Sequence, residues 1–230
     1  MKNKILTLII PAKNESESLP IVLNNLKKFN YNIIVSLNKN DHETINSINN
    51  YENVQILKQS AKGYGNALIE GINACKTKYF CIYNADGSFD ENDLPEMLEL
   101  NYQYDFVFTS RYSLGGSSDD DTIITYLGNQ FFSLLGRIFF SLKISDILYT
   151  FVMGNTESFK KLNVINSDFR FCVEFPIKMQ KKKMKYFSIP SYEKKRIAGI
   201  KKVNAFKDGF LILLVVSLFI IHWLLVGRRI

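Results

Sequence analysis

The sequence contains few of the residues that build disulfide frameworks and transition-metal sites. Its 230 residues include three cysteines without paired spacing (Cys75, Cys81 and Cys172) and two histidines (His42 and His222). These numbers exclude a small disulfide-linked fold, a structural zinc site and a histidine-rich metal site. Cys75 and Cys81 fall in or near apolar stretches, where free cysteine behaves as a small hydrophobic residue. We therefore expect reduced thiols and a reducing compartment.

Charged residues are also limited, at 22%, against 47% hydrophobic residues, so a packed core is expected rather than wholesale disorder. The length fits one large domain or two small ones. Near the start, the apolar run Ile5–Ile10 is too short for the core of a signal peptide and lacks a following cleavage site of small residues. We expect this run to form a first core strand.

The first half of the chain alternates apolar, β-rich runs with helical patterns. This alternation predicts an α/β fold with a mostly parallel sheet and helices on both faces. Such sheets bind ligands at the carboxyl ends of their strands, so a site is expected in the loops after Ile10, Leu37 and Tyr83. The predicted strands are Ile5–Ile10, Tyr31–Leu37, Val54–Leu57, Tyr79–Tyr83 and Phe106–Thr109, and the predicted helices are Glu17–Phe29, Glu43–Asn50, Asn66–Lys76 and Asp93–Tyr102.

The second half contains two long apolar segments. After a Gly-, Ser- and Asp-rich stretch, Tyr112–Thr122, which we expect to be a mobile loop, residues 123–144 predict a long apolar helix. That helix could be a core helix or could lie in a membrane surface. The final run, Phe210–Val226, has 17 residues, close to the shortest that spans a bilayer. It predicts membrane insertion, spanning or re-entrant, with a helix packed on the domain as the alternative. The expected division is residues 1–208 and 209–230.

The net charge of +7 is concentrated in residues 178–207, directly before the final apolar run. A basic segment at that position favours the anionic cytoplasmic leaflet of a membrane. Arg228 and Arg229 favour the opposite orientation, because a full span would carry them across, so the topology stays open. A nucleic-acid partner is not expected, because stacking aromatic residues are not interleaved with the basic segment.

A polar motif, Asn84-Ala85-Asp86-Gly87-Ser88, follows a predicted buried strand. In an extended chain the oxygen atoms of Asn84, Asp86 and Ser88 would lie on one side. Mg²⁺ and Mn²⁺ take such ligands together with water and substrate phosphates. An ordinary polar turn would give the same pattern, so the spacing alone leaves both explanations open.

Several motifs together resemble glycosyltransferase family 2, which has the GT-A fold. They are "IIPAKNESESLP", "KGYGNALIEGI", the Asn84–Ser88 motif, "TSRY", "ISDILYTFVMGNTESFKKL" and "RIAGIKKVNAFKDG", in this order from Ile5 to about Phe210. The resemblance is greatest to the branch that makes polyprenyl-phosphate sugars, similar to dolichol-phosphate mannosyltransferase. It implies a membrane-associated enzyme at the cytoplasmic face that transfers a sugar from a nucleotide-sugar donor to polyprenyl phosphate with Mg²⁺ or Mn²⁺.

The resemblance also implies roles for individual residues. Asp86 and Arg111 would be catalytic, the latter together with Arg137 contacting the acceptor phosphate. A metal would be held by Asn84, Asp86 and Ser88, although the family normally has Asp at the first position. Gly199 belongs to the basic motif that closes on the diphosphate. The implied nucleotide-sugar contacts are Pro11, Ala12, Lys13, Glu15, Asn38, Lys62, Asn84, Ala85, Arg196 and Lys202.

Structural roles compete with these assignments. Glu15 could cap the helix that begins near Ser18, and Arg111 could be a surface residue. Lys62 and Gly63 could form an ordinary loop, Ser145 and Asp146 an ordinary turn, and Lys181–Lys183 a solvated or headgroup-facing run.

Two other functions remain open. One is transfer to a glycan hydroxyl, which would need a base such as Glu174 or Asp146. The other is a degenerate, non-catalytic membrane-bound homologue, suggested by Asn84 and by the missing acidic pair around Asn38.

Overall fold

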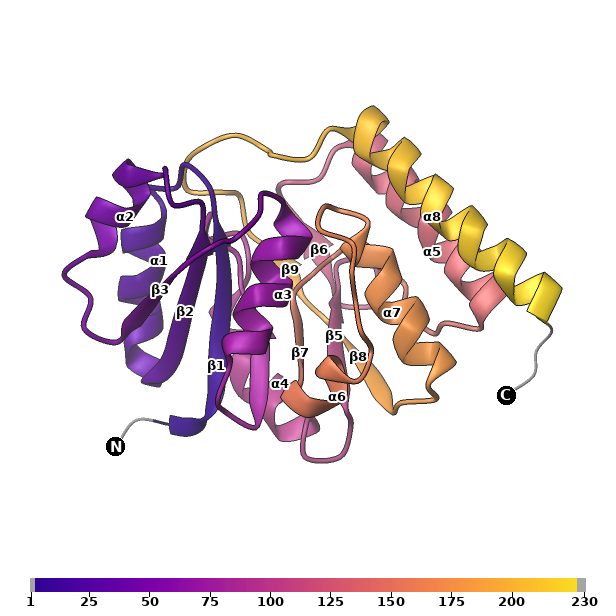
Figure 1. Cartoon of the computed structure of the whole chain (residues 1–230), viewed down its shortest axis with the longest axis horizontal. Helices are drawn as coiled ribbons and strands as arrows, with labels where there is room; N and C mark the ends of the chain where they lie inside the picture. The colour runs from indigo at the N-terminus through magenta and orange to yellow at the C-terminus, as the bar shows by residue number, and fades with distance from the viewer. Residues whose placement is uncertain (1–2, 227–230) are drawn as a thin grey trace.

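The computed structural model describes residues 3–226 and contains a seven-stranded sheet with helices on both faces (Figure 1). The strand order is β3-β2-β1-β4-β7-β5-β8, and every neighbouring pair is parallel except the two pairs that include β7. The predicted mostly parallel α/β fold is confirmed. The strands are β1 (Asn3–Ala12), β2 (Tyr31–Leu37), β3 (Val54–Lys58), β4 (Tyr79–Ile82), β5 (Phe106–Ser110), β7 (Val152–Asn155) and β8 (Tyr186–Pro190), with a separate two-stranded sheet of β6 (Ser117–Ser118) and β9 (Tyr192–Glu193).

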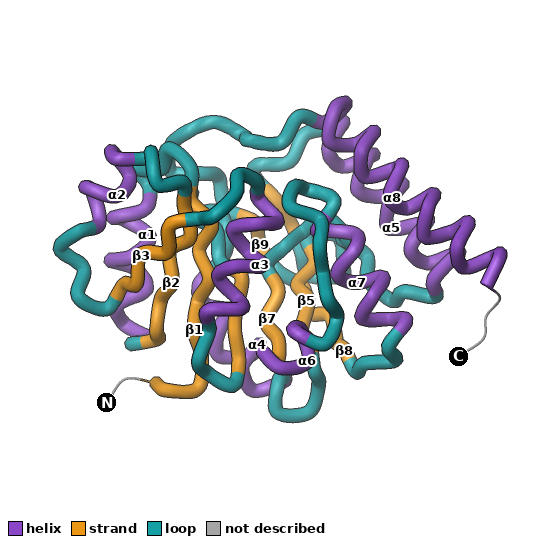
Figure 2. Tube along the Cα trace, in the orientation of Figure 1, coloured by secondary structure: helices purple, strands orange, loops and turns teal. Residues whose placement is uncertain are grey.

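Helices lie on both faces of the sheet (Figure 2), and a hydrophobic core lies between the sheet and the helices on each face. Side chains alternate along β1, so Leu8 and Ile10 enter the core beneath α1 and α4, whereas Ile9 enters the core beneath α3 and α7. Each predicted strand and helix of the first half is present, with ends shifted by at most two residues when the 3-10 turn η1 is counted with α1. The helices are α1 (Leu19–Leu26), α2 (His42–Ile48), α3 (Tyr64–Ala74), α4 (Leu94–Leu100), α5 (Ile123–Phe140), α6 (Thr156–Lys160), α7 (Phe171–Lys181) and α8 (Ala205–Val226), with 3-10 turns η1 (Lys27–Phe29) and η2 (Glu91–Asp93).

Strand β7 lies inside the sheet and is one of several elements of the second half, with β6, β8, β9 and α6, that the apolar pattern did not predict. It is four residues long, runs antiparallel between β4 and β5, and contains Gly154. A Cβ atom on Gly154 would lie 2.3 Å from Cδ1 of Phe106, so the close packing of β7 on β5 requires glycine. The inserted strand leaves β1, β4 and β5 mutually parallel, and their carboxyl ends therefore share one edge of the sheet.

The two long apolar helices, α5 and α8, lie side by side at one end of the molecule (Figure 1). Residues Ala205–Leu225 are long and apolar enough to cross a membrane, by length and composition. However, α8 also contacts α7, and the ring of Trp223 packs edge-on to Phe140, with centroids 5.9 Å apart. The division of the chain at residue 208 stays a prediction, and Arg228 and Arg229 lie outside the described residues.

Candidate functional site

The Asn84–Ser88 motif follows β4 at the carboxyl edge of the sheet. The chain turns here instead of remaining extended, because Gly87 has a φ of +79° and the backbone N–H of Ser88 donates to Oδ1 of Asp86 at 3.0 Å. Nδ2 of Asn84 lies 3.4 Å from Oγ of Ser88. The motif therefore gathers its polar atoms through a turn, not through the alternation of a strand.

A basic segment from the C-terminal half, Lys194–Lys202, lies across this motif, and we call it the strap. Its backbone is fixed there, because Lys194 N–H donates to the Ser88 carbonyl at 2.7 Å and Ile197 N–H donates to the Asp86 carbonyl at 2.9 Å. Its side chains meet acidic groups: Arg196 Nη1 lies 3.5 Å from Asp86 Oδ2, and Lys202 Nζ lies 3.3 Å from Glu15 Oε1. The structure thus brings together four of the predicted site residues.

Glu15 lies between the start of α1 and the strap. Its carboxylate accepts a hydrogen bond from the Ser18 hydroxyl at 2.8 Å, and its carbonyl accepts from Leu19 N–H at 2.9 Å, so it supports the start of α1. The same carboxylate faces Lys202 and Gly199 of the strap.

Asp120, which the sequence reasoning missed, is the second carboxylate on Arg196. Its Oδ2 accepts from Nη2 of Arg196 at 2.9 Å and lies 3.3 Å from Nζ of Lys201. Burial alone would raise the pKa of Asp120, but the hydrogen bond from Arg196 and the two positive charges outweigh burial and hold that pKa below its ordinary value. The available signal was the acidic run Asp119–Asp121, which we treated only as part of a loop.

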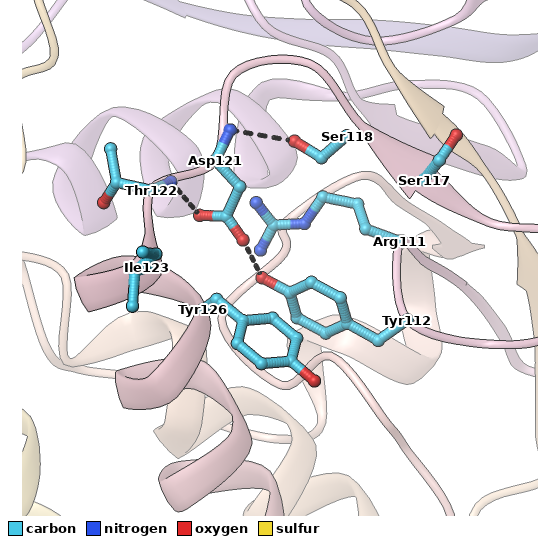
Figure 3. Close-up of a pocket in the computed structure, with 8 residues that line it drawn as sticks. All are labelled: Arg111, Tyr112, Ser117, Ser118, Asp121, Thr122, Ile123 and Tyr126. Atoms are coloured by element: carbon cyan, nitrogen blue, oxygen red, sulfur yellow. Dashed lines mark hydrogen bonds between the residues drawn. The ribbon is translucent and has the colours of Figure 1, made fainter.

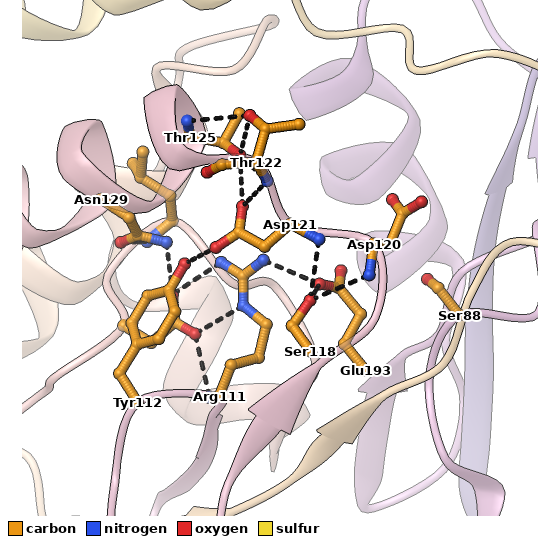
Figure 4. Close-up of polar contacts among 12 residues, drawn as sticks. Ser88, Arg111, Tyr112, Ser118, Asp120, Asp121, Thr122, Thr125, Asn129 and Glu193 are labelled. Carbon is orange, nitrogen blue, oxygen red and sulfur yellow. Dashed lines mark hydrogen bonds and ion pairs between the residues drawn. The ribbon is translucent and has the colours of Figure 1, made fainter.

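The side chain of Arg111 is only 10% exposed and is paired with carboxylates (Figure 4). Its Nε and Nη2 donate to the two oxygens of Asp146 at 2.8 and 3.0 Å, and its Nη1 donates to Glu193 at 2.9 Å. Burial lowers the pKa of this guanidinium, but the hydrogen bonds and charge of Asp146 outweigh burial and raise it above the ordinary value. Asp146 is fully buried and also accepts from Asn129, so it orients Arg111 and does not form a simple surface turn.

A pocket of about 300 Å³ lies beside Arg111 (Figure 3). Asp121 lies within it and accepts hydrogen bonds from the hydroxyls of Tyr112 and Thr125 and from Thr122 N–H. Ser118 links the pocket to Arg111, since its hydroxyl donates to Glu193 and accepts from the N–H groups of Asp120 and Asp121. The segment expected to be mobile is thus held by hydrogen bonds. The pocket is lined by Arg111, Tyr112, Ser117, Ser118, Asp121, Thr122, Ile123 and Tyr126.

Other predicted residues lie at the same edge of the sheet without a common cluster. Asn38 follows β2 and accepts from Asn40 N–H at 2.9 Å. Lys62 is exposed just before α3. Pro11 and Ala12 end β1, exposed Lys13 follows them, and Ala85 is buried within the motif.

Arg137 is the predicted residue that the structure does not bring to the site. It lies on α5 eight residues beyond Asn129, or about 12 Å of helical rise from the Arg111 cluster.

The two carboxylates considered as bases for a hydroxyl acceptor are both engaged in the fold. Glu174 is 1% exposed, accepts from Ile165 and Asn166 N–H, and pairs with Lys178 at 2.6 Å. Asp146 is paired with Arg111. Neither geometry leaves a carboxylate free to take a proton from a substrate.

The oxygen donors for a hard cation are few. Within residues 3–226, no group of three or more His, Cys, Asp or Glu side chains could hold a metal ion. Asp86 supplies one carboxylate, with the Ser88 hydroxyl and the Asn84 amide beside it. This set suits Mg²⁺ or Mn²⁺ only when a ligand supplies further oxygens.

Comparison with known proteins identifies the family. Residues 7–162, more than half of the chain, match the model of glycosyl transferase family 2. The chain therefore belongs to glycosyl transferase family 2, and the resemblance seen in its sequence is confirmed at this level.

Relatives with similar sequences come from mycobacteria. The chain is 31% identical over 117 residues to the uncharacterized glycosyltransferases Rv0539 of Mycobacterium tuberculosis and Mb0553 of Mycobacterium bovis. The match covers 50% of the chain and 53% of each relative, so the chain spans about half the length of the curated relatives it matches.

Solved structures share the fold at low sequence identity. Glucosyl-3-phosphoglycerate synthase from Mycobacterium tuberculosis, crystallised with Mn²⁺, UDP and phosphoglyceric acid, superposes with a TM-score of 0.69 at 12% identity, covering 95% of this chain and 78% of that one. Mannosyl-3-phosphoglycerate synthase from Rubrobacter xylanophilus gives 0.72 at 13% identity, covering 94% and 73%. At these identities the likeness shows the GT-A fold alone.

Proposed function

We propose that this glycosyltransferase transfers a sugar from a nucleotide-diphosphate sugar to a polyprenyl phosphate at the cytoplasmic face of a membrane. The observation that carries the donor half is the strap, whose Arg196 and Lys202 face Asp86 and Glu15 at the carboxyl edge of the sheet. The acceptor half is supported by the position of the pocket at the start of α5, one of the two apolar helices.

In this proposal the strap residues bind the donor diphosphate. Arg196 and Lys202 now neutralise protein carboxylates at 3.5 and 3.3 Å, separations that a phosphate oxygen could replace with shorter contacts. Asp120 would keep Arg196 in place through its separate contact on Nη2. The departing diphosphate would then meet two fixed positive charges, which stabilise the negative charge that develops on it.

We assign Asn84, Asp86 and Ser88 to a divalent cation, Mg²⁺ or Mn²⁺, shared with the diphosphate. The oxygen donors of the motif fit such an ion, and the neighbours of the same fold were crystallised with Mn²⁺ or Mg²⁺ and UDP. When bound, the cation would neutralise charge on the leaving group. Asn84 contributes no charge, so cation affinity should depend strongly on the donor.

The acceptor phosphate needs no protein base, because it is already ionised at neutral pH. Asp146 and Glu193 use three of the five N–H donors of Arg111, so a phosphate would contact the second N–H of Nη1 or Nη2 or replace Glu193 on Nη1. Arg137 would not share this contact, given its distance along α5.

A second candidate is transfer to a hydroxyl acceptor. The paired state of Arg111 favours it, and the solved neighbours include enzymes whose complexes contain phosphoglyceric acid. Since Glu174 and Asp146 are engaged, the base would be Asp121 in the pocket, which would have to exchange a hydrogen bond from Tyr112 or Thr125 for one from the acceptor.

An acceptor panel tests the proposal. Purified full-length protein is incubated with UDP- and GDP-sugars, Mg²⁺ or Mn²⁺, and either polyprenyl phosphate or hydroxyl acceptors, and products are identified by mass spectrometry. A polyprenyl-phosphate sugar supports the proposal. A glycoside formed only on a hydroxyl replaces it with the second candidate, and donor binding without product on any acceptor would favour the non-catalytic homologue.

A further inference from the structure

Helices α5 and α8 each expose an apolar face to solvent. On α5, Ile124, Leu127 and Phe131 are 58%, 60% and 47% exposed, and on α8, Phe210, Leu218 and Leu225 are 61%, 66% and 81% exposed. These spacings of three, four, seven or eight residues keep each set on one side of its helix. The two helices lie side by side (Figures 1 and 2), and we take the two exposed sets together as one surface, which we call the apolar face. An exposed apolar surface of this extent marks an interaction site.

The opposite side of α8 is packed on the domain from Ile212 to Trp223. Ile212 and Val216 are 3% and 1% exposed in the core that also contains Phe140. Near the end of α8, Trp223 contacts Phe140 and lies under Nζ of Lys181, the last residue of α7, at 5.5 Å. Residues of the globular domain therefore contact α8 as far as its last turns.

This packing bears on the membrane geometry of α8, which the sequence predicts to be spanning or re-entrant unless the helix packs on the domain. A helix of 22 residues is long enough to span a bilayer, at about 33 Å. If α8 spanned, however, the ends of α5 and α7 would have to enter the hydrocarbon with it, together with Lys181. We infer that α8 does not span, and that α5 and α8 together lie flat in the membrane surface with the apolar face toward the lipid.

Charge identifies the occupant as an anionic lipid surface rather than a second copy of the chain. Exposed lysines occur at both ends of the helix pair: Lys207 in the first turn of α8, and Lys182 and Lys183 just after α7 near its other end. Two copies meeting through the apolar face would bring like charges together in either orientation. Anionic headgroups would instead be attracted at both ends.

The inference deepens the membrane location in the proposed function, and its test needs neither donor nor acceptor. Partition of the full chain is measured on vesicles of phosphatidylcholine, with and without anionic phosphatidylglycerol. We expect stronger binding to the anionic vesicles, with a gain that salt reduces. Leu127→Glu on α5 and Leu218→Glu on α8 should each lower the partition coefficient about tenfold or more, the scale of losing one buried leucine. The control is Ile21→Glu, since Ile21 is 45% exposed on α1, away from this face.

Depth measurements separate the lying helix from a spanning one. In a Trp223→Phe background, which removes the single tryptophan, tryptophan is placed at Phe210, Leu218 or Leu225 and quenched by phospholipids brominated at different depths. A lying helix gives the same shallow depth at all three positions, whereas greatest depth at the middle position would overturn the inference. So would an unchanged partition of Leu127→Glu, which needs no tryptophan variant, an absence of vesicle binding, or a soluble dimer that Leu127→Glu dissociates.

Discussion

Arg196 joins carboxylates from two loops that are distant in sequence, Asp86 after β4 and Asp120 before α5. The two contacts differ: the pair with Asp120 is a hydrogen bond of 2.9 Å, whereas the pair with Asp86 is a looser 3.5 Å. The looser partner is the one that the proposed cation and diphosphate would engage. Asp120 then acts as a support that keeps the guanidinium in place when Asp86 turns to its ligand.

Asp86→Asn should abolish sugar transfer while leaving the fold intact. Asp86 is the sole carboxylate of the Asn84–Ser88 motif, and its backbone, which holds the strap through Ile197 N–H, is unchanged by the substitution. We expect a rate loss of at least about a hundredfold, the scale of removing one stabilising group from a transition state. Turnover is compared with that of Glu157→Gln, an exposed control carboxylate with a side chain 73% accessible. Near wild-type turnover with unchanged metal dependence would remove Asp86 from the metal site.

Asp120→Asn should weaken the strap at neutral pH but not in acid. The folded protein holds the pKa of Asp120 below its ordinary value of about 3.8. Its contribution to the free energy of unfolding is therefore fully present above about pH 4 to 5 and is lost as pH falls through the folded-state pKa. We expect a loss of about 1–2 kcal/mol at pH 7, the scale of a hydrogen bond to a charged group, and this loss vanishes below the folded-state pKa. Urea unfolding across pH measures it, and a pH-independent difference would contradict the ion-pair origin.

Arg111→Lys should destabilise the protein whether or not Arg111 binds an acceptor. Lysine cannot reproduce the two parallel hydrogen bonds to Asp146, and that carboxylate is fully buried. We expect a loss of about 2–4 kcal/mol in the free energy of unfolding, because a buried charge is left poorly paired. Chemical denaturation measures the loss. Wild-type stability in this variant would mean that Arg111 is not a structural partner of Asp146, and would return it to a purely acceptor-binding role.

These site contacts show where residue-level prediction succeeds and fails. Asp86, Arg196, Glu15 and Lys202 were predicted from their resemblance to family motifs, and the structure brings them together. Asp120 and Glu193 were missed because their roles depend on partners 76 and 82 residues away in the chain, which no local pattern encodes.

At the scale of elements, the sequence predicted those strands and helices whose apolar residues follow a regular spacing. The five strands and four helices of the first half are present because the strands have short apolar runs, the helices have apolar residues at helical spacing, and polar turns separate them. β7 has four residues with glycine among them, too short for a periodic signal, and its antiparallel direction depends on its neighbours. The composition of Tyr112–Thr122 predicts a mobile loop. Composition does not reveal the hydrogen bonds that Ser118 and Asp121 make in this segment.

Gly154→Ala tests whether the β7–β5 contact is as close as the structure indicates. The added Cβ atom would lie 2.3 Å from the Phe106 ring and 3.3 Å from the Asp105 carbonyl, so the buried ring or the strands must shift. We expect a loss of about 1–3 kcal/mol, the usual cost of overpacking. Gly128→Ala on α5 is the matched control: its Cβ meets nothing within 4 Å, and helix propensity predicts a gain of up to about 1 kcal/mol. Equal effects at the two positions in urea unfolding would contradict this packing.

At the scale of the whole molecule, the strap connects the proposed donor site at the Asn84–Ser88 motif with helix α8. It begins after β9, crosses the Asn84–Ser88 motif, and leads within three residues into α8. Its exposed Ile200, at 76%, continues the apolar character of the helices toward the site. A chain arranged in this way can hold its donor site at a fixed distance from a lipid surface, so membrane docking and acceptor use should be coupled while donor binding is not.

Leu127→Glu should therefore separate acceptor delivery from chemistry. Leu127 is 60% exposed on α5, one turn from the pocket residue Ile123, and makes no contribution to the strap or the Asn84–Ser88 motif. If the acceptor is a polyprenyl phosphate, kcat/KM for acceptor carried in vesicles should fall about tenfold, in step with vesicle partition. Transfer to a short-chain acceptor phosphate in solution, and the donor dissociation constant by calorimetry, should remain at wild-type values. Equal losses with both acceptors would mean that Leu127 acts on the pocket itself. An unchanged rate with the vesicle-borne acceptor, despite weakened partition, would mean that the acceptor does not reach the site through the apolar face.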